Sequence, residues 1–258
     1  MMRLGTPQEE ACDLNAQTLS RRVALAAAAT GAIIAASLGV RVNASAAPIP
    51  HVLRSAASTS ESGSTAAVFA HPTGSGHLLV AFVSANTGNP GAINVTDNAG
   101  NPWTRAVAVG SGSVDIAGEI WYSANALSVT QVNIQTAFQS NLAARVDEVV
   151  GVVKVSPLET TNFNTDFGTT LSTGEVGVAG TNDVVMAALT GHGNTQKMTV
   201  TATGWNNQHQ IKLAPTGTDA VSLAVGWKNG VVGNAEDYTA TVPVAMNWSG
   251  LIVVFQAR

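Results

Sequence analysis

Asp115 and Glu119 are the acidic residues whose spacing best suits hydrolytic chemistry. Residues at even separations along a β-strand point to the same face, so a strand over Val114–Ser123 would align both carboxyl groups. Hydrolysis of a glycoside requires such a pair, with one carboxyl group as acid and the other as nucleophile or base. Trp121 falls in phase with both acids and opposite the apolar residues of the strand. We therefore predict a ligand platform of Asp115, Glu119 and Trp121 on the wetter face.

The segment Asp115–Glu119 resembles the acidic motif of laminarinase-like jelly-roll glycosidases, in which the motif lies on one strand. Ser113 occupies the position of the motif's first glutamate, so the nucleophile of such an enzyme is missing. Asp147 and Glu148 are neighbours in another strand and point to opposite faces, so they cannot act as a facing pair. The sequence also lacks a Gly-x-Ser-x-Gly elbow, a phosphate loop and a dinucleotide fingerprint. These features favour a non-catalytic domain over an enzyme.

Oxygen-bearing side chains gather at Asp97, Asn98 and Asn101, between two expected strands. Hard cations such as Ca²⁺ bind oxygen ligands of this kind, and no other cofactor is indicated. The same residues also close turns through hydrogen bonds to their own backbone, with Gly100 supplying a positive φ. The full spacing of a known calcium loop is absent. A turn is therefore the favoured interpretation, and a calcium site is the alternative.

Tryptophans form a further group of candidate binding residues, because a planar indole can stack on a sugar ring. Trp205 lies in an expected loop and is, with Trp121, predicted to be exposed. Trp227 and Trp248 are each in phase with the apolar residues of their strands, so both are predicted to be core residues. The sequence thus predicts Trp121 and Trp205 as the ligand-binding tryptophans.

The strands that would position these residues are indicated by a two-residue periodicity with frequent turn signals. Ser128–Phe138 alternates apolar and polar residues, as expected for a half-buried antiparallel strand. His77–Ser84 and Leu251–Phe255 are apolar on both faces and are expected at the centre of sheets. Asn229-Gly230 is a candidate for a two-residue hairpin turn. The pattern predicts an all-β fold, a two-sheet antiparallel β-sandwich of jelly-roll type.

Residues 1–46 are expected to be a helical or disordered export signal. Arg21 and Arg22 precede an uncharged run over 23–40, which resembles a twin-arginine export signal. Ala44 and Ala46 then form the small-x-small pattern that a signal peptidase accepts, so we predict cleavage after Ala46. A retained membrane anchor is the alternative, because the uncharged run is just long enough to span a bilayer.

This processing would divide the chain into three parts. Residues 1–46 form the signal, residues 47–65 a flexible lead-in rich in Ser, Ala and Thr, and residues 66–258 the sandwich domain. The expected location is extracellular, or the cell surface if the apolar segment is retained. The mature domain itself is not expected to be embedded in a membrane.

The composition excludes several classes of partner. From Ala47 onward the chain carries 8 Lys or Arg and 13 Asp or Glu, which leaves a formal charge of −5. This charge and the lack of a basic run argue against nucleic acid and anionic lipid as partners. Cys12, the only cysteine, lies in the signal. The mature protein is therefore expected to have neither a disulfide nor a cysteine nucleophile.

Five segments carry a resemblance to a known kind of domain. They are HLLVAFV over 77–83, VTDNAGNPWT over 95–104, IWYSANA over 120–126, RVDEVVGV over 145–152 and WSGLIVVF over 248–255. In this order they resemble a β-sandwich domain with a VTDxxGNxW signature, which recurs in secreted and surface proteins of actinobacteria and other environmental bacteria. The resemblance implies an exported β-sandwich and assigns no enzymatic activity or binding residue.

The function that these features favour is an exported, non-catalytic β-sandwich for extracellular binding or surface structure. An extracellular polysaccharide or cell-wall glycan is the expected partner. One alternative is a secreted, glycosidase-like hydrolase with an atypical site. The other is a self-assembling cell-surface subunit, and the sequence leaves the oligomeric state open.

Overall fold

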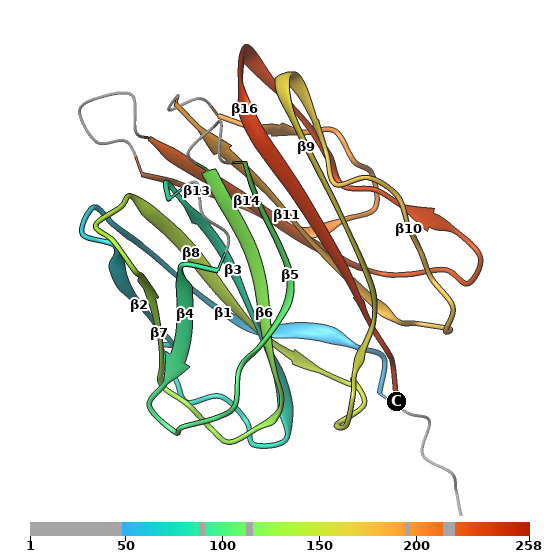
Figure 1. The fold of residues 1–258 in the computed structure, drawn as a ribbon. Helices are drawn as coiled ribbons and strands as arrows, with labels where there is room; N and C mark the ends of the chain where they lie inside the picture. The colour runs from blue at the N-terminus through green and yellow to red at the C-terminus, as the bar shows by residue number, and fades with distance from the viewer. Residues whose placement is uncertain (1–47, 88–90, 112–115, 194–196, 214–219) are drawn as a thin grey trace, which may run out of the picture. The chain divides into compact units, whose positions relative to one another are not determined.

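The computed structural model describes residues 48–258, except 88–90, 112–115, 194–196 and 214–219. The predicted signal residues and one predicted platform residue lie outside this part of the chain: Arg21, Arg22, Ala44, Ala46 and Asp115. Sixteen strands run through the described residues (Figure 1). Among these residues there is no helix, and hence none that could cross a membrane.

A five-stranded antiparallel sheet, called here the central sheet, forms the middle of the domain. Its strand order is β1 (His51–Ser60), β8 (Leu142–Val150), β3 (His77–Ala85), β6 (Ile116–Ala126) and β5 (Thr104–Ser111). β3 pairs with β8 on one side and β6 on the other. The expectation that His77–Ser84 is a central strand is therefore confirmed.

A second antiparallel sheet, the large sheet, lies on one side of the central sheet. Its main path is β12 (Thr199–Val200), β16 (Thr239–Phe255), β11 (Val184–His192), β14 (Val221–Asn229) and β13 (Asn206–Leu213). β9 (Leu158–Ser172) also belongs to it and pairs with β16. β13 and β9 therefore form opposite edges of this sheet.

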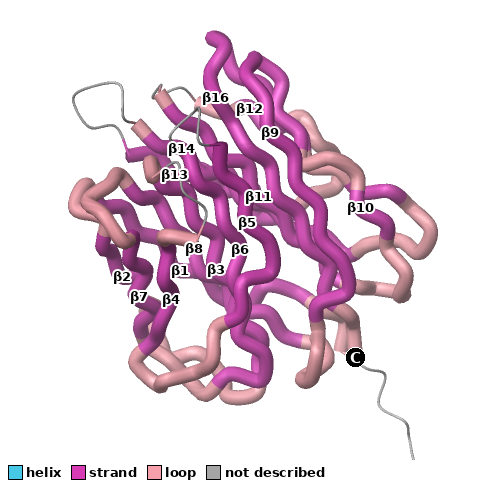
Figure 2. The backbone as a smooth tube through the Cα atoms, viewed as in Figure 1, coloured by secondary structure: helices cyan, strands magenta, loops and turns pink. Residues whose placement is uncertain are grey.

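Two smaller sheets complete the domain. The small sheet has the order β2 (Ser64–Val68), β7 (Gln131–Thr136) and β4 (Ile93–Asp97). A two-stranded ribbon of β10 (Val176–Gly177) and β15 (Ala235–Glu236) lies beyond the large sheet. Figure 2 shows the small, central and large sheets as successive layers.

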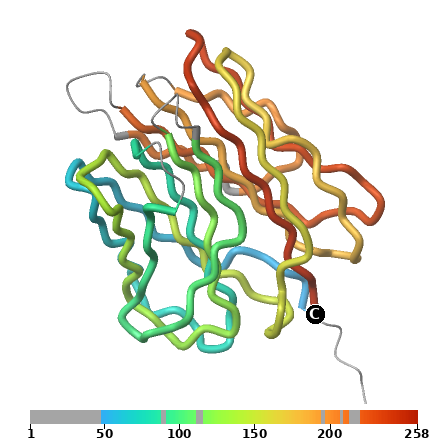
Figure 3. Tube along the Cα trace, in the orientation of Figure 1, coloured from blue at the N-terminus to red at the C-terminus, as the bar shows by residue number. Residues whose placement is uncertain are grey.

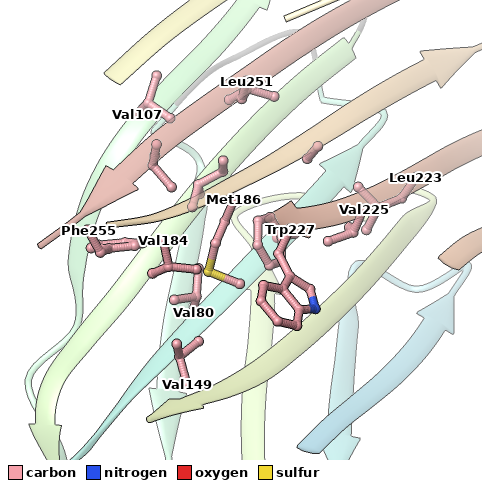
Figure 4. Close-up of a cluster of buried hydrophobic side chains, with 14 of the residues drawn as sticks. Val80, Val107, Val149, Val184, Met186, Leu223, Val225, Trp227, Leu251 and Phe255 are labelled. Atoms are coloured by element: carbon pink, nitrogen blue, oxygen red, sulfur yellow. The ribbon is translucent and has the colours of Figure 1, made fainter. Parts of the chain in front are cut away.

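The central sheet is buried on both faces because side chains alternate along each of its strands. Val80 and Phe82 of β3 pack against the large sheet, while Leu79 and Ala81 pack against the small sheet. Figure 4 shows the first of these cores, with Val80 beside Met186 and Trp227. The antiparallel β-sandwich predicted from the sequence is confirmed, and the small sheet adds a third layer to it.

The prediction that residues 47–65 form a flexible lead-in was wrong, because most of this segment is a paired strand. Residues 51–60 form β1, which pairs with β8 from His51↔Val150 to Ser60↔Leu142. Only Ala56 of β1 is buried, so the sequence of this strand shows no alternation of apolar and polar residues. Backbone pairing, which side-chain patterns do not report, therefore places β1 at the sheet edge. Figure 3 shows that the start of the described chain lies near the C-terminus, and Pro48 and Arg258 both contact Gly151.

The predicted two-residue hairpin at Asn229-Gly230 was also wrong. β14 ends at Asn229, and the Gly230 N–H donates to the Asp183 carbonyl oxygen at 2.7 Å. Gly230 lacks a positive φ; a Cβ there would lie 2.7 Å from Val178 Cγ2. Close packing, not turn geometry, therefore requires this glycine.

Candidate functional site

Glu119 and Trp121 lie together on one face of β6, but the expectation that this face is wet was wrong. Glu119 has no exposed surface. The Trp121 Nε1–H donates to Glu119 Oε2 at 2.6 Å, and the Gly91 N–H donates to Oε1 at 2.7 Å. The face is covered because the central sheet packs against the small sheet and the segment that leads to it. Gly91 has a φ of 100°, which favours glycine where its N–H meets the carboxylate.

Burial raises the pKa of Glu119, and the Trp121 side chain is occupied by contacts within the protein. Burial raises the pKa of Glu119, while the hydrogen bonds from Gly91 and Trp121 and the nearby Arg105 oppose this rise. Arg105 Nη1 lies 3.6 Å from Glu119 Oε1, and its guanidinium carbon lies 5.8 Å from the Trp121 ring centroid. The half-buried indole is therefore engaged by Glu119 at its nitrogen and by Arg105 over its ring.

Glu148 forms a comparable buried contact on β8. Its Oε1 accepts a hydrogen bond from the Gly74 N–H at 2.6 Å and lies 2.6 Å from His77 Nδ1. Arg54 Nε lies 3.6 Å from Oε2. Gly74 precedes β3 and Gly91 follows it, so each glutamate holds one of the two connections between β3 and the small sheet. These contacts give both buried glutamates a structural role.

Glu119 and Glu148 do not form the facing pair that glycoside hydrolysis requires. Glu119 pairs across the sheet with Val83 of β3, whereas Glu148 pairs with Leu79. Four residues along a strand correspond to about 13 Å, and the two acids also flank β3 on opposite sides. Catalytic carboxyl groups lie about 5–9.5 Å apart. Asp147 and Glu148 point to opposite faces of β8, as predicted.

Arg145 and Asp147 form a buried ion pair in the layer between the central and large sheets. Arg145 Nε donates to Asp147 Oδ1 at 2.7 Å, and Arg145 Nη2 donates to Ser55 Oγ of β1 at 3.0 Å. Burial raises the pKa of Asp147, and Arg145, Ser55 and His209 oppose the rise. Our sequence analysis did not assign this pair, although an Arg and an Asp two residues apart in an apolar strand are an unusual signal.

An open groove lies next to this pair, between the edge strands β1 and β13. Its volume is about 350 Å³. The lining residues are Ala57, Ser58, Thr59, His209, Gln210, Ile211 and Lys212. A second hollow, of about 250 Å³, also contacts His209 and Gln210 and extends to Met198 and Ala224. The edge strand β13 is thus flanked by two hollows.

Trp205 does not form the exposed platform that the sequence predicted. It is only 7% exposed and packs against Tyr238, with 4.7 Å between the ring centroids. Lys228 Nζ lies 5.9 Å from its ring centroid. Trp205 directly precedes β13, so what looked like a loop residue packs on the outer face of the large sheet. The prediction that Trp227 and Trp248 are core residues is confirmed.

The Asp97 loop is held by hydrogen bonds within the protein. Asp97 Oδ1 accepts from the N–H groups of Ala99 and Asn101, at 2.8 and 3.2 Å, and Oδ2 accepts from Trp103 Nε1 at 2.9 Å. Asn98 Oδ1 accepts from the backbone N–H groups of Thr130 and Gln131, where β7 begins. A calcium ion would have to displace these donors. In the described part of the chain, no three His, Cys, Asp or Glu side chains are grouped to hold a metal.

Replacing Asp97 with asparagine is expected to lower the free energy of unfolding by about 1–2 kcal/mol, because an amide NH₂ cannot accept the bonds that one carboxylate oxygen accepts. Urea unfolding measured by tryptophan fluorescence would give this value. A calorimetric melt of the wild-type chain with and without CaCl₂ provides the second arm. A rise in Tm with CaCl₂ that disappears in Asp97→Asn would favour the calcium alternative over the turn.

No family model, no curated protein and no solved structure matches this chain. Of the features described above, the buried carboxylates serve internal contacts, whereas the groove between β1 and β13 is open to solvent. The groove is thus the better candidate for a ligand site.

Proposed function

We propose that this protein is an exported, non-catalytic β-sandwich that binds a neutral carbohydrate polymer in the groove between β1 and β13. The observation that carries the proposal is the open groove, lined mainly by neutral polar and apolar side chains together with the charged Lys212. Export is supported by the twin-arginine-like segment with Arg21 and Arg22 and by the small-x-small pattern that ends at Ala46. The ligand is an extracellular polysaccharide or cell-wall glycan.

The chemistry of the groove suits a polyhydroxylated ligand. Thr59 of β1 supplies a hydroxyl group and Gln210 of β13 supplies an amide, so donors and acceptors for sugar hydroxyls lie on both walls. Ala57 and Ile211 supply apolar surface for the C–H groups of a sugar ring. Because the groove runs between two edge strands at the side of the sandwich, it suits a chain better than an enclosed small molecule.

Two further observations support binding without catalysis. The buried carboxylates Glu119, Glu148 and Asp147 each accept hydrogen bonds or face cations from within the fold. None of these acids lines the groove. A hydrolase would need two carboxyl groups that face a bound glycoside.

Affinity electrophoresis in gels that contain soluble polysaccharides tests this proposal. The wild-type chain should be retarded, and the double variant His209→Ala/Gln210→Ala should bind about tenfold more weakly, as expected for one to two lost hydrogen bonds. The double variant His71→Ala/Gln256→Ala is the matched control, because both residues are exposed and lie outside the groove.

Retardation that the groove variant loses and the control keeps would support the proposal. Equal retardation of both variants would place the ligand elsewhere. No retardation of the wild type on any polysaccharide would overturn the carbohydrate assignment.

A further inference from the structure

β9 presents a long edge with which no other strand of the described chain forms a backbone pair. One side of β9 pairs with β16, and no strand among the described residues pairs with its other side. The strand runs over Leu158–Ser172, and it carries Phe163 and Phe167 at 54% and 63% exposure. A long, exposed edge with apolar side chains is a template on which another chain can add a strand.

Three side chains along β9 accept hydrogen bonds from the backbone of the next residue. Asn162 Oδ1 accepts from the Phe163 N–H at 2.9 Å. Asn164 Oδ1 accepts from the Thr165 N–H at 2.9 Å, and Asp166 Oδ1 accepts from the Phe167 N–H at 2.7 Å. The pattern repeats at every second residue, so it follows the alternation of the strand.

The N–H groups that these side chains occupy are those of the free edge. In an antiparallel pair, the backbone groups of successive residues point alternately toward the partner strand and away from it. The N–H groups of Phe163, Thr165 and Phe167 are donated to side chains of β9 itself and not to β16. They are therefore the donors that an incoming strand would need.

Asn162 is also held in the orientation that this role requires. Its Nδ2 donates to the Glu175 carbonyl oxygen at 2.8 Å. The side-chain oxygen is thereby directed to the Phe163 N–H, while the amide nitrogen faces an acceptor. The orientation of the Asn162 side chain is consequently fixed by two hydrogen bonds.

We propose that Asn162, Asn164 and Asp166 form an edge cap that prevents strand addition at β9. An incoming strand would have to break three internal hydrogen bonds before it could form its own. Each exchange would replace a bond that is already made, so pairing at this edge gains little free energy. The cap thereby opposes assembly of copies of this chain through β9.

The triple variant Asn162→Thr/Asn164→Thr/Asp166→Thr tests the cap in the full chain. Threonine suits a strand and stays polar, but it lacks the side-chain carbonyl that accepts these bonds. Light scattering after size-exclusion chromatography should show a concentration-dependent rise in mass that the wild type lacks. Hydrogen exchange at low concentration should be about fivefold faster at the three N–H groups, equivalent to about 1 kcal/mol per lost bond.

Two further variants keep the test specific. Asn94→Thr/Asn234→Thr/Glu61→Thr removes two amides and one carboxylate, the same change of charge, at exposed positions away from β9, and it should behave as the wild type. Adding Phe163→Ser and Phe167→Ser to the triple variant separates strand pairing from apolar contact. Association that persists, with the three N–H groups protected in the assembled form, supports the cap.

Two results would overturn the proposal. One is a triple variant whose mass and amide exchange match those of the wild type. The other is association that vanishes on removal of the two phenylalanines while the N–H groups of Phe163, Thr165 and Phe167 never become protected.

Discussion

Replacing Arg145 with methionine is expected to lower the free energy of unfolding at pH 7 by about 3–5 kcal/mol, the cost of leaving a buried charge without its partner. Arg145 and Asp147 are 3% and 0% exposed and share a hydrogen bond of 2.7 Å. Methionine fills similar volume, so the loss reports the charge and not a cavity. Lys197→Met, at an exposed lysine, is the control and should change stability by about 0.5 kcal/mol or less.

The pH dependence of this loss separates electrostatics from packing. Burial raises the pKa of Asp147, and removing Arg145 removes the largest opposing effect. A carboxyl group with a raised pKa costs no stability below its unfolded pKa and destabilises the fold as the pH rises through its folded pKa. The deficit of Arg145→Met should therefore be largest at pH 7 and should narrow toward pH 4 in urea unfolding.

The double variant Arg145→Met/Asp147→Leu completes the test. Because it removes both charges, its stability should return to within about 1 kcal/mol of the wild type or exceed it. A double variant as unstable as Arg145→Met at every pH would contradict the electrostatic explanation. It would indicate that packing between the central and large sheets cannot tolerate either apolar side chain.

The ion pair also bears on the proposed ligand site. Arg145 Nη2 donates to Ser55 Oγ, and Ser55 belongs to β1, one wall of the groove. Only Ala56 of β1 is buried, so this strand has few apolar contacts to position it. The buried guanidinium therefore supplements the backbone pairing that fixes β1 opposite β13. Its loss should weaken binding in the groove as well as stability.

The strands that two-residue periodicity predicted are those with apolar residues on at least one face. His77–Ser84 was expected at a sheet centre because both its faces are apolar, and β3 lies there. Trp227 and Trp248 were assigned to the core because each is in phase with the apolar residues of its strand, and both are buried. β1 and β9 escaped prediction because they are edge strands with mostly exposed residues, and their backbone pairing leaves no mark on the sequence pattern.

The candidate site was harder to predict because polarity was equated with exposure. Glu119 beside Trp121 suggested a wet face, yet a third layer covers this side of β6. The buried acid is compatible with that layer only because Gly91, Trp121 and Arg105 meet its oxygens. The sequence of β6 gives no indication that Gly91 and Arg105 contact Glu119. The partners that make burial of a charge tolerable come from distant segments, so the site requires the fold.

Replacing Glu119 with glutamine is expected to lower the free energy of unfolding by about 1–3 kcal/mol, because one buried donor loses its acceptor. Both carboxylate oxygens accept hydrogen bonds, one from Gly91 and one from Trp121. In glutamine, the NH₂ group would face one of these donors in either orientation of the amide. Urea unfolding followed by tryptophan fluorescence measures this loss. Glu61→Gln, at an exposed glutamate, is the matched control.

The sign of the pH effect follows from the raised pKa of Glu119. The folded wild type binds a proton more tightly at Glu119 than the unfolded chain does, so its stability falls as the pH rises above the ordinary value of 4.5. The glutamine variant lacks this dependence. The difference in unfolding free energy between the wild type and Glu119→Gln should therefore be largest near pH 4 and should become smaller toward pH 7. A loss of unfolding free energy that is the same at every pH would contradict the raised pKa of Glu119. Polysaccharide hydrolysis by the wild type that disappears in Glu119→Gln would show that this glutamate is catalytic and not structural.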